Sequence, residues 1–131
     1  MSATILIADD DSNIVQALRF LMEKEGYVVR VATDGEAALA AVARHRPDVL
    51  LLDVMMPRRN GFDVCKAIRA DPDLAGTRII MLSAKGLAGE RERGLRAGAD
   101  DYVTKPFSTR ELILRVNEMM RQDAARRPGA G

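Results

Sequence analysis

Short apolar runs alternate with longer amphipathic segments along the chain. Five of these runs are short and continuous, as parallel strands covered on both faces are, and they span residues 4–8, 27–32, 48–52, 78–82 and 102–104. The segments that follow them carry apolar residues at helical spacing. Since each right-handed crossover between parallel strands requires such a helix, the pattern predicts an α/β fold. We expect a doubly wound sheet of five parallel strands between two layers of helices, which is a three-layer sandwich.

Capping residues mark where several of these helices begin and end. Thr33 with Glu36, and Ser108 with Glu111, have the spacing of a capping box, so a helix is expected to begin at each pair. Gly26 follows the first helical apolar face, at a place where a left-handed residue closes a helix. Two further helices are expected over residues 61–70 and 88–97.

The length of 131 residues suffices for one domain and not for two. From residue 122 onwards the helical periodicity is lost, and Pro and Gly appear. We therefore predict one domain over residues 1–121, and a flexible C-terminal tail or the start of a linker over residues 122–131.

Charge and hydropathy narrow the function classes. The 20 Lys and Arg residues nearly balance the 19 Asp and Glu residues, so nothing indicates direct binding of nucleic acid by this segment. The mean hydropathy is −0.11, and no apolar run approaches the roughly 18 residues of a membrane span, so no membrane contact is predicted. A single cysteine, and an N-terminus without the pattern of a secretory signal, favour a cytoplasmic protein.

Polar residues stand directly after four of the predicted strands. They are Asp9 with Asp10 and Asp11 after the first, Asp53 after the third, Ser83 after the fourth, and Lys105 with Pro106 after the fifth. In an open α/β sheet, ligands bind outside the carboxyl ends of the strands, so we expect these side chains to converge. Clustered carboxylates repel one another unless they bind a cation. Magnesium is favoured over calcium, because it uses one or two carboxylates together with waters and a phosphoryl oxygen. One His and one Cys, far apart in the sequence, argue against zinc.

A carboxylate beside such a cation can act as a nucleophile on a phosphoryl group and form an aspartyl phosphate. Lys105 would then supply a compact positive charge for the phosphoryl oxygens, and Ser83 would supply one hydrogen bond.

Four segments resemble the receiver domain of two-component response regulators, and they read ILIADDDSNI, LLLDVMMPRRNGFDV, IIMLSAKG and GADDYVTKPFSTREL. The resemblance covers about residues 3–121, with order and spacing intact. It implies a (βα)5 flavodoxin-like fold with strand order 2-1-3-4-5. It also implies a signalling domain that catalyses only its own phosphorylation and dephosphorylation.

Transferred residue by residue, the resemblance implies that Asp53 accepts the phosphoryl group. Asp10 would bind Mg²⁺, or Mn²⁺ in its place, directly, and Asp9 would bind it through water. Asp53 itself and the backbone carbonyl of Met55 would complete the protein ligands. The donor would be a sensor histidine kinase or a phosphotransfer protein.

The same resemblance implies how the signal leaves the site. Ser83 would be the switch hydroxyl, Lys105 would pair with the phosphoryl group, and the peptide bond between Lys105 and Pro106 would be cis. The ring of Tyr102 would turn inward when Ser83 moves toward the phosphoryl group. This population shift would change the face made by the fourth helix, the fifth strand and the fifth helix, and so signal to a downstream effector protein or to a C-terminal output domain.

A weaker match concerns that face. Arg91, Asp101, Glu111 and Arg115 stand where the receivers of winged-helix transcription regulators form salt bridges between subunits. The match implies a phosphorylation-dependent homodimer, in which a two-fold axis would repeat each pair. The alternative is a solvated helical face with local ion pairs.

Two other functions remain open at this stage. A small phosphatase of the haloacid dehalogenase type also begins with a strand that ends in Asp-x-Asp, and it would use Asp9 as the nucleophile. Asp100 with Asp101 resembles its later acidic motif, although Asn13 departs from its pattern and the chain is short for such an enzyme. A flavodoxin-like nucleotide carrier ranks third, because the chain lacks a G-x-G-x-x-G motif and a phosphate loop.

Overall fold

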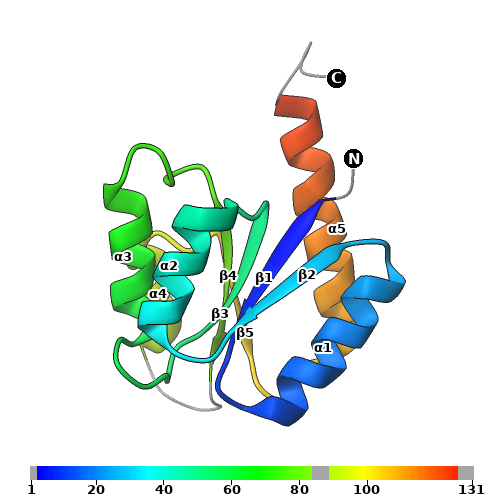
Figure 1. The fold of residues 1–131 in the computed structure, drawn as a ribbon, viewed down its shortest axis with the longest axis horizontal. Helices are drawn as coiled ribbons and strands as arrows, with labels where there is room; N and C mark the ends of the chain where they lie inside the picture. The colour runs from blue at the N-terminus through cyan, green and yellow to red at the C-terminus, as the bar shows by residue number, and fades with distance from the viewer. Residues whose placement is uncertain (1–2, 84–88, 127–131) are drawn as a thin grey trace.

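The structure, a computed structural model, describes residues 3–83 and 89–126, with side chains up to residue 122. Five parallel strands form one sheet in the order β2-β1-β3-β4-β5 (Figure 1). The strands are β1 (Thr4–Ala8), β2 (Val28–Ala32), β3 (Val49–Asp53), β4 (Arg78–Ser83) and β5 (Asp101–Thr104). The predicted doubly wound sheet, with its flavodoxin-like strand order, is therefore confirmed.

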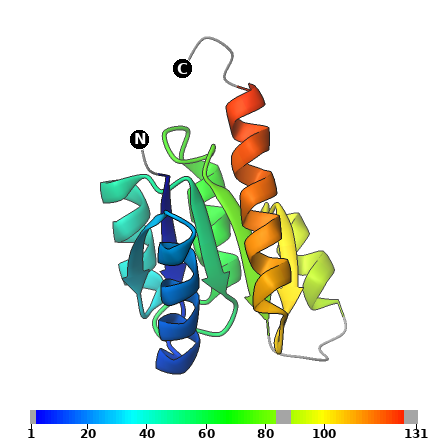
Figure 2. The same ribbon diagram turned by 90° about the vertical axis from the view of Figure 1, so that its right-hand side faces the viewer.

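Helices cover both faces of this sheet. They are α1 (Ser12–Lys24), α2 (Gly35–His45), α3 (Gly61–Ala70), α4 (Glu90–Ala97) and α5 (Thr109–Arg126). The buried side chains fall into two clusters, one under α2, α3 and α4 and the other under α1 and α5. Figures 1 and 2 show the same division, so the three-layer sandwich is confirmed. Within residues 3–83 and 89–126, no helix combines the length and the apolarity that a membrane span requires.

The two clusters explain why the central strands are continuously apolar. In β1, Ile5 and Ile7 face the cluster under α1 and α5, while Leu6 and Ala8 face the opposite cluster. Alternate residues of a strand point to opposite faces, so a strand covered on both faces needs an apolar residue at every position. The edge strand β2 is less completely covered, and its Val28 is 44% exposed.

Most of the predicted helix ends are correct. Gly26 has a φ of 96°, the left-handed conformation expected of a residue that closes a helix. At the other end of the chain, the Ser108 hydroxyl accepts a hydrogen bond from the Glu111 backbone N–H at 3.2 Å, as a capping residue does.

Three boundaries differ from the prediction. The capping box at Thr33 is wrong, because Asp34 is the N-cap and its carboxylate accepts from the Ala37 N–H at 2.8 Å. The fourth helix begins at Glu90, and residue 88, where it was expected to start, lies outside the described residues. The last helix continues to Arg126, beyond the predicted end of regular structure at residue 121. Its last turns extend past the edge of the sheet (Figure 2), where no neighbouring element imposes an apolar face.

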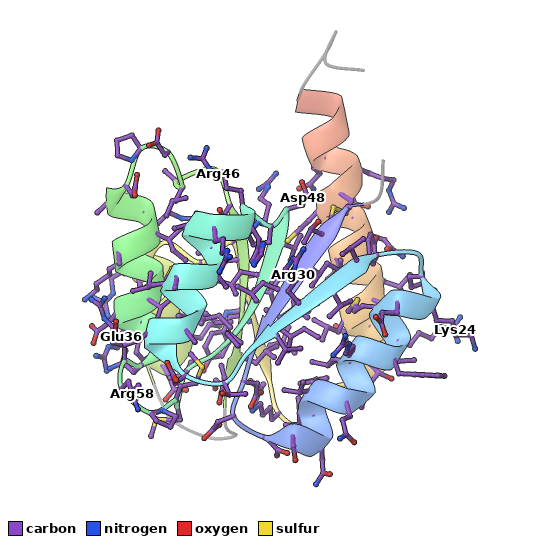
Figure 3. All side chains as sticks on the ribbon, viewed as in Figure 1. Lys24, Arg30, Glu36, Arg46, Asp48 and Arg58 are labelled. Atoms are coloured by element: carbon purple, nitrogen blue, oxygen red, sulfur yellow. The ribbon has the colours of Figure 1, made fainter. Side chains whose placement is uncertain are left out.

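The connection between β3 and α3 packs directly on the start of α2. The Gly35 N–H donates to the Pro57 carbonyl oxygen at 3.2 Å. Two ion pairs flank this contact, Arg58 with Asp34 at 3.6 Å and Arg59 with Glu36 at 3.8 Å; Arg58 and Glu36 are labelled in Figure 3. A Cβ atom at Gly35 would lie 2.2 Å from the Arg59 carbonyl oxygen, so only glycine permits this approach.

Gly35→Ala is therefore expected to lower the free energy of unfolding by about 1–3 kcal/mol, because backbone atoms must move to accept the methyl group. Gly76→Ala is the matched control: no atom lies within 4 Å of a Cβ at Gly76, and the change is expected to be neutral or slightly stabilising. Urea unfolding of the two variants tests the difference. Equal effects of the two substitutions would contradict it.

Candidate functional site

The carboxyl ends of β1, β3, β4 and β5 meet at one edge of the sheet, the lower edge in Figure 1. Three carboxylates converge there as expected: Asp9, Asp10 and Asp53 each offer an oxygen, and these oxygens lie within 4.8 Å of one another. Asp9 and Asp53 are buried, whereas Asp10 is exposed. One side of the cluster is therefore open to solvent.

Local backbone contacts hold Asp9 in place. Its N–H donates to the Ala32 carbonyl oxygen at 3.1 Å, which continues the pairing of β1 with β2 beyond the strand. Its carboxylate accepts from the Asp11 N–H at 2.9 Å, which forms the turn into α1. The contacts at the end of β1 thus hold the Asp9 carboxylate in place. The turn that follows sets the direction in which α1 begins.

Lys105 joins the two buried carboxylates. Its Nζ lies 2.9 Å from Asp9 Oδ2 and 3.3 Å from Asp53 Oδ1. Burial lowers the pKa of Lys105, but its hydrogen bonds and charge interactions with the two carboxylates outweigh this effect and raise the pKa overall. Lys105 stays protonated and neutralises part of the negative charge. The peptide bond from Lys105 to Pro106 is cis, as the resemblance implied.

The charge of Lys105 does not fully offset the unfavourable ionisation of the Asp53 carboxylate. Burial and the neighbouring Asp9 raise the pKa of Asp53 from 3.8 to about 6, while the charge and hydrogen bond of Lys105 and the Met55 backbone N–H oppose the rise. The cluster therefore favours a further cation near its solvent side.

The donor set fits magnesium. Three carboxylate oxygens are hard ligands, and the exposed side of the cluster leaves room for the waters that Mg²⁺ retains. Met55 is 64% exposed, and its backbone N–H donates a hydrogen bond to the Asp53 carboxylate, so its backbone lies at the site. The residues that could hold the ion are Asp9, Asp10, Asp53 and the Met55 carbonyl.

In metal-free buffer, Asp53→Asn is expected to raise the free energy of unfolding at pH 7.5 by about 1–3 kcal/mol. A shift of about two pKa units corresponds to about 3 kcal/mol, and this net shift already includes the favourable contact with Lys105. Because the raised pKa makes the wild-type chain take up a proton on folding, the penalty of Asp53 is present above pH 6 and fades as the pH falls toward 4. Urea unfolding at pH 7.5 and 4.5 measures the gain; an equal gain at both pH values would contradict this assignment.

Ser83 lies fully inside the protein beside Tyr102. The Tyr102 hydroxyl is hydrogen-bonded to the Ser83 hydroxyl and to Glu90 Oε1, the latter at 3.1 Å. The Tyr102 ring is buried, so it already points inward in this structure, whereas the sequence placed that orientation in the phosphorylated form. Glu90 was missed by the sequence reasoning. The sequence feature that could have indicated Glu90 is an acidic residue at the start of a helix. That feature by itself does not differ from an ordinary favourable charge at a helix N-terminus.

The four residues of the predicted dimer face are partly brought together within one chain. Arg115 lies 2.6 Å from Asp101 Oδ2 and 3.0 Å from Glu111 Oε1, and the hydrogen bonds to these two acids raise the pKa of Arg115. Arg91 lies on the exposed side of α4. In the single chain, the face therefore contains a local cluster of ion pairs.

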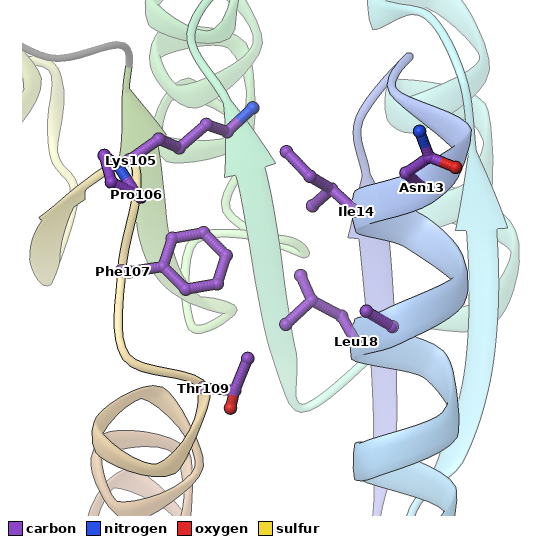
Figure 4. Close-up of a pocket in the computed structure, with 8 residues that line it drawn as sticks. Asn13, Ile14, Leu18, Lys105, Pro106, Phe107 and Thr109 are labelled. Atoms are coloured by element: carbon purple, nitrogen blue, oxygen red, sulfur yellow. The ribbon is translucent and has the colours of Figure 1, made fainter.

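A groove of about 490 Å³ runs beside the carboxylate cluster, between α1 and the connection from β5 to α5 (Figure 4). Ile14 and Leu18 form one wall, and Phe107 faces them from the other. Lys105 and Pro106 close the end next to the cluster. The sequence did not predict this groove, because its two walls lie far apart in the chain.

The residues needed by the phosphatase alternative have other roles. The Asp11 carboxylate accepts from the Asn13 and Ile14 N–H groups at 2.9 and 3.4 Å, and so caps α1. The Asp100 carboxylate accepts a hydrogen bond from the Ile79 N–H at 2.8 Å. Asp100 therefore lies at the amino end of β4, at the opposite end of the strands from Asp9. No observation in the described residues supports Asp9 as a nucleophile.

Comparison with known proteins agrees with this geometry. Residues 5–117 match the family model described as the response regulator receiver domain. A candidate response regulator from Chloroflexus aurantiacus J-10-fl is 37% identical, with a TM-score of 0.87 over 92% of this chain and 99% of that one. The receiver domain of the Francisella response regulator 1452 is 38% identical, with a TM-score of 0.86 over 93% and 99%. NtrX from Brucella abortus is 29% identical, with a TM-score of 0.85 over 98% of this chain but only 29% of that one. Since the family model matches most of the chain, the protein belongs to the response regulator receiver domain family.

Proposed function

We propose that this receiver domain accepts a phosphoryl group on Asp53 in a Mg²⁺-dependent reaction. The observation that carries the proposal is the buried Asp53 carboxylate, with Lys105 Nζ at 3.3 Å and the oxygens of Asp9 and Asp10 within 4.8 Å. A nucleophile, a fixed positive charge and a site for a divalent cation thus lie together at one edge of the sheet.

The phosphoryl donor is a sensor histidine kinase or a phosphotransfer protein. An Asp53 oxygen attacks phosphorus and forms the new P–O bond, while the P–N bond to the donor histidine breaks and its electron pair returns to the imidazole. Lys105 balances charge on the phosphoryl oxygens. Asp9, Asp10, Asp53 and the Met55 carbonyl would hold Mg²⁺, which would supply further positive charge for the same oxygens. The cation can be Mn²⁺ as well, since the donors are all oxygen.

The donor protein docks over the groove beside the site. Ile14 and Phe107, which are half-buried, offer it an apolar surface, and Lys105 lies at the end that leads to Asp53. A partner seated there would hold its phosphoryl group beside the carboxylate cluster and exclude water from it.

Phosphorylation then moves Ser83 and Tyr102, and these two residues change the face made by α4, β5 and α5. The domain acts in the cytoplasm, and the changed face binds a downstream effector protein or an attached output domain. The far greater length of NtrX supports the second arrangement. In a phosphorylated homodimer, Asp101, Glu111 and Arg115 would exchange their internal ion pairs for pairs across a two-fold axis that also engage Arg91.

Acetyl phosphate with Mg²⁺, followed by intact mass measurement and peptide mapping, tests the proposed reaction. One phosphoryl adduct on Asp53, absent when EDTA is added, is the expected result. An adduct on Asp9, or turnover of acetyl phosphate with no adduct on Asp53, would overturn the proposal.

Light scattering with beryllofluoride, which mimics the tetrahedral phosphoryl group, tests the homodimer separately. A change from monomer to dimer is expected. An unchanged mass with beryllofluoride bound would reject the homodimer and leave the docking of an effector.

A further inference from the structure

The connection from β3 to α3 runs beside the carboxylate cluster and is fixed at both ends. Near its start, the Met55 backbone N–H donates to the Asp53 carboxylate. At its other end, the Gly61 N–H donates to the Val54 carbonyl oxygen at 2.8 Å. A Cβ atom at Gly61 would lie 2.5 Å from the Asp53 carbonyl oxygen, so α3 begins in direct contact with the backbone of β3. A displacement in the middle of the connection must therefore be absorbed within residues 55–60.

A strained turn lies in the middle of this connection. The Arg59 N–H donates to the Pro57 carbonyl oxygen at 2.8 Å, and Arg58 between them has a φ of 72°. A hydrogen bond that spans three residues, with a positive φ at the central one, is the rarer and more strained form of the γ-turn. The Arg58 side chain is 70% exposed, so its own packing does not impose this conformation. Contacts from elsewhere in the structure must therefore hold the turn.

The start of α2 supplies those contacts. The Gly35 N–H donates to the same Pro57 carbonyl oxygen at 3.2 Å, and a Cβ atom at Gly35 would lie 2.2 Å from the Arg59 carbonyl oxygen. α2 cannot withdraw freely, because its buried face packs on the sheet. A methyl group at Gly35 would therefore push the turn by about 1 Å before ordinary van der Waals contact is reached. Since the proline ring fixes φ at Pro57, the displacement falls on Met55 and the residue after it.

We propose that Gly35 is a positioning residue which, through the turn at Arg58, places the Met55 backbone and thereby sets the preference of the site for Mg²⁺ over Ca²⁺. The inference rests on the proposed function and adds to it a determinant of the cation that the site takes. Mg²⁺ requires nearly ideal octahedral geometry with short bonds, whereas Ca²⁺ accepts longer bonds and irregular geometry. A displaced Met55 carbonyl therefore weakens the binding of Mg²⁺ more than the binding of Ca²⁺.

Titrations with Mg²⁺ and with Ca²⁺, followed by amide chemical shifts, test this role. Gly35→Ala is expected to lower the ratio of the Mg²⁺ affinity to the Ca²⁺ affinity about fivefold or more, since residues that hold metal ligands in place have effects of this size. A loss of folded protein would lower both affinities equally, so the ratio separates positioning from stability. Gly76→Ala is the matched control, because a Cβ atom there meets nothing within 4 Å, and it is expected to keep the wild-type ratio.

Two variants at Arg58 test the same turn without a change at a buried position. Arg58→Val and Arg58→Gly both remove the ion pair with Asp34, but valine strongly disfavours a positive φ, whereas glycine adopts it readily. We expect Arg58→Val to lower the affinity ratio about fivefold or more, and Arg58→Gly to keep it within about twofold of the wild type.

An unchanged ratio in Arg58→Val, or in folded Gly35→Ala, would overturn the inference. An equal fall in Arg58→Val and Arg58→Gly would also overturn it, because the effect would then belong to the arginine side chain and not to the turn. A wild-type protein that neither binds Mg²⁺ at the carboxylate cluster nor accepts a phosphoryl group would overturn the proposed function together with this inference. Wild-type labelling of Asp53 by acetyl phosphate, with unchanged ratios in the variants, would overturn this inference alone.

Discussion

Asp53→Asn is expected to abolish Mg²⁺-dependent labelling by acetyl phosphate, a loss of at least about 100-fold. The amide lacks the anionic oxygen that attacks phosphorus. The fold should persist, since an amide has the same shape as the carboxylate. Intact mass measurement after incubation with acetyl phosphate, next to a thermal unfolding curve, gives both results.

Asp63→Asn is a suitable control for that experiment. Asp63 is an exposed acid in the first turn of α3, and its amide variant should label as the wild type does. Labelling retained in Asp53→Asn would remove the central claim. Labelling lost in both variants would point to a general loss of folding or metal binding, which the unfolding curve and a Mg²⁺ titration separate.

Lys105→Ala is expected to separate phosphorylation from its structural consequence. The nucleophile and the metal carboxylates remain, so an adduct still forms on Asp53. The conformational change requires more: a shift from about 1:99 to 99:1 needs roughly 5.5 kcal/mol in favour of the active form. Charge-assisted hydrogen bonds contribute about 1.5–3 kcal/mol each, so the Ser83 contact alone leaves both forms populated.

Amide chemical shifts along α4 and β5, recorded with and without beryllofluoride, measure this uncoupling. Lys66→Ala, which removes an exposed lysine of α3, is the control and should respond as the wild type does. A complete response in Lys105→Ala would contradict the role of this lysine in the switch. Loss of the adduct itself would instead assign Lys105 to the transfer step.

The carboxylate cluster could be predicted because each member directly follows a strand. Asp9 and Asp53 are 44 residues apart in number, yet β1 and β3 are paired in register, from Ile5 with Val49 to Ala8 with Leu52. An apolar run sets each strand, and parallel pairing places the carboxyl ends at the same edge. The convergence of these side chains follows from local pattern and general topology alone.

Other parts of the site depended on packing between distant segments. The groove beside Lys105 exists because Phe107 comes to lie opposite Ile14 and Leu18. Likewise, Asp100 could resemble a catalytic acid in the sequence, whereas Arg69 and the Ile79 N–H hold it at the amino end of β4. Nothing in the local sequence of either segment indicates its partner.

By itself, the sequence determined the number, order along the chain and type of the main elements, the family resemblance, and the residues of the carboxylate cluster. These features rest on short apolar runs, on caps, and on polar residues at strand ends, all of which are local. Only the tertiary structure decided that Asp34 and not Thr33 caps α2, and that Tyr102 lies inward between Ser83 and Glu90. It also decided that Arg115 pairs with Asp101 and Glu111 within one chain. The physical reason is the same in each case: several side chains could make the contact, and the packing of helices on the sheet brings one of them within hydrogen-bonding distance.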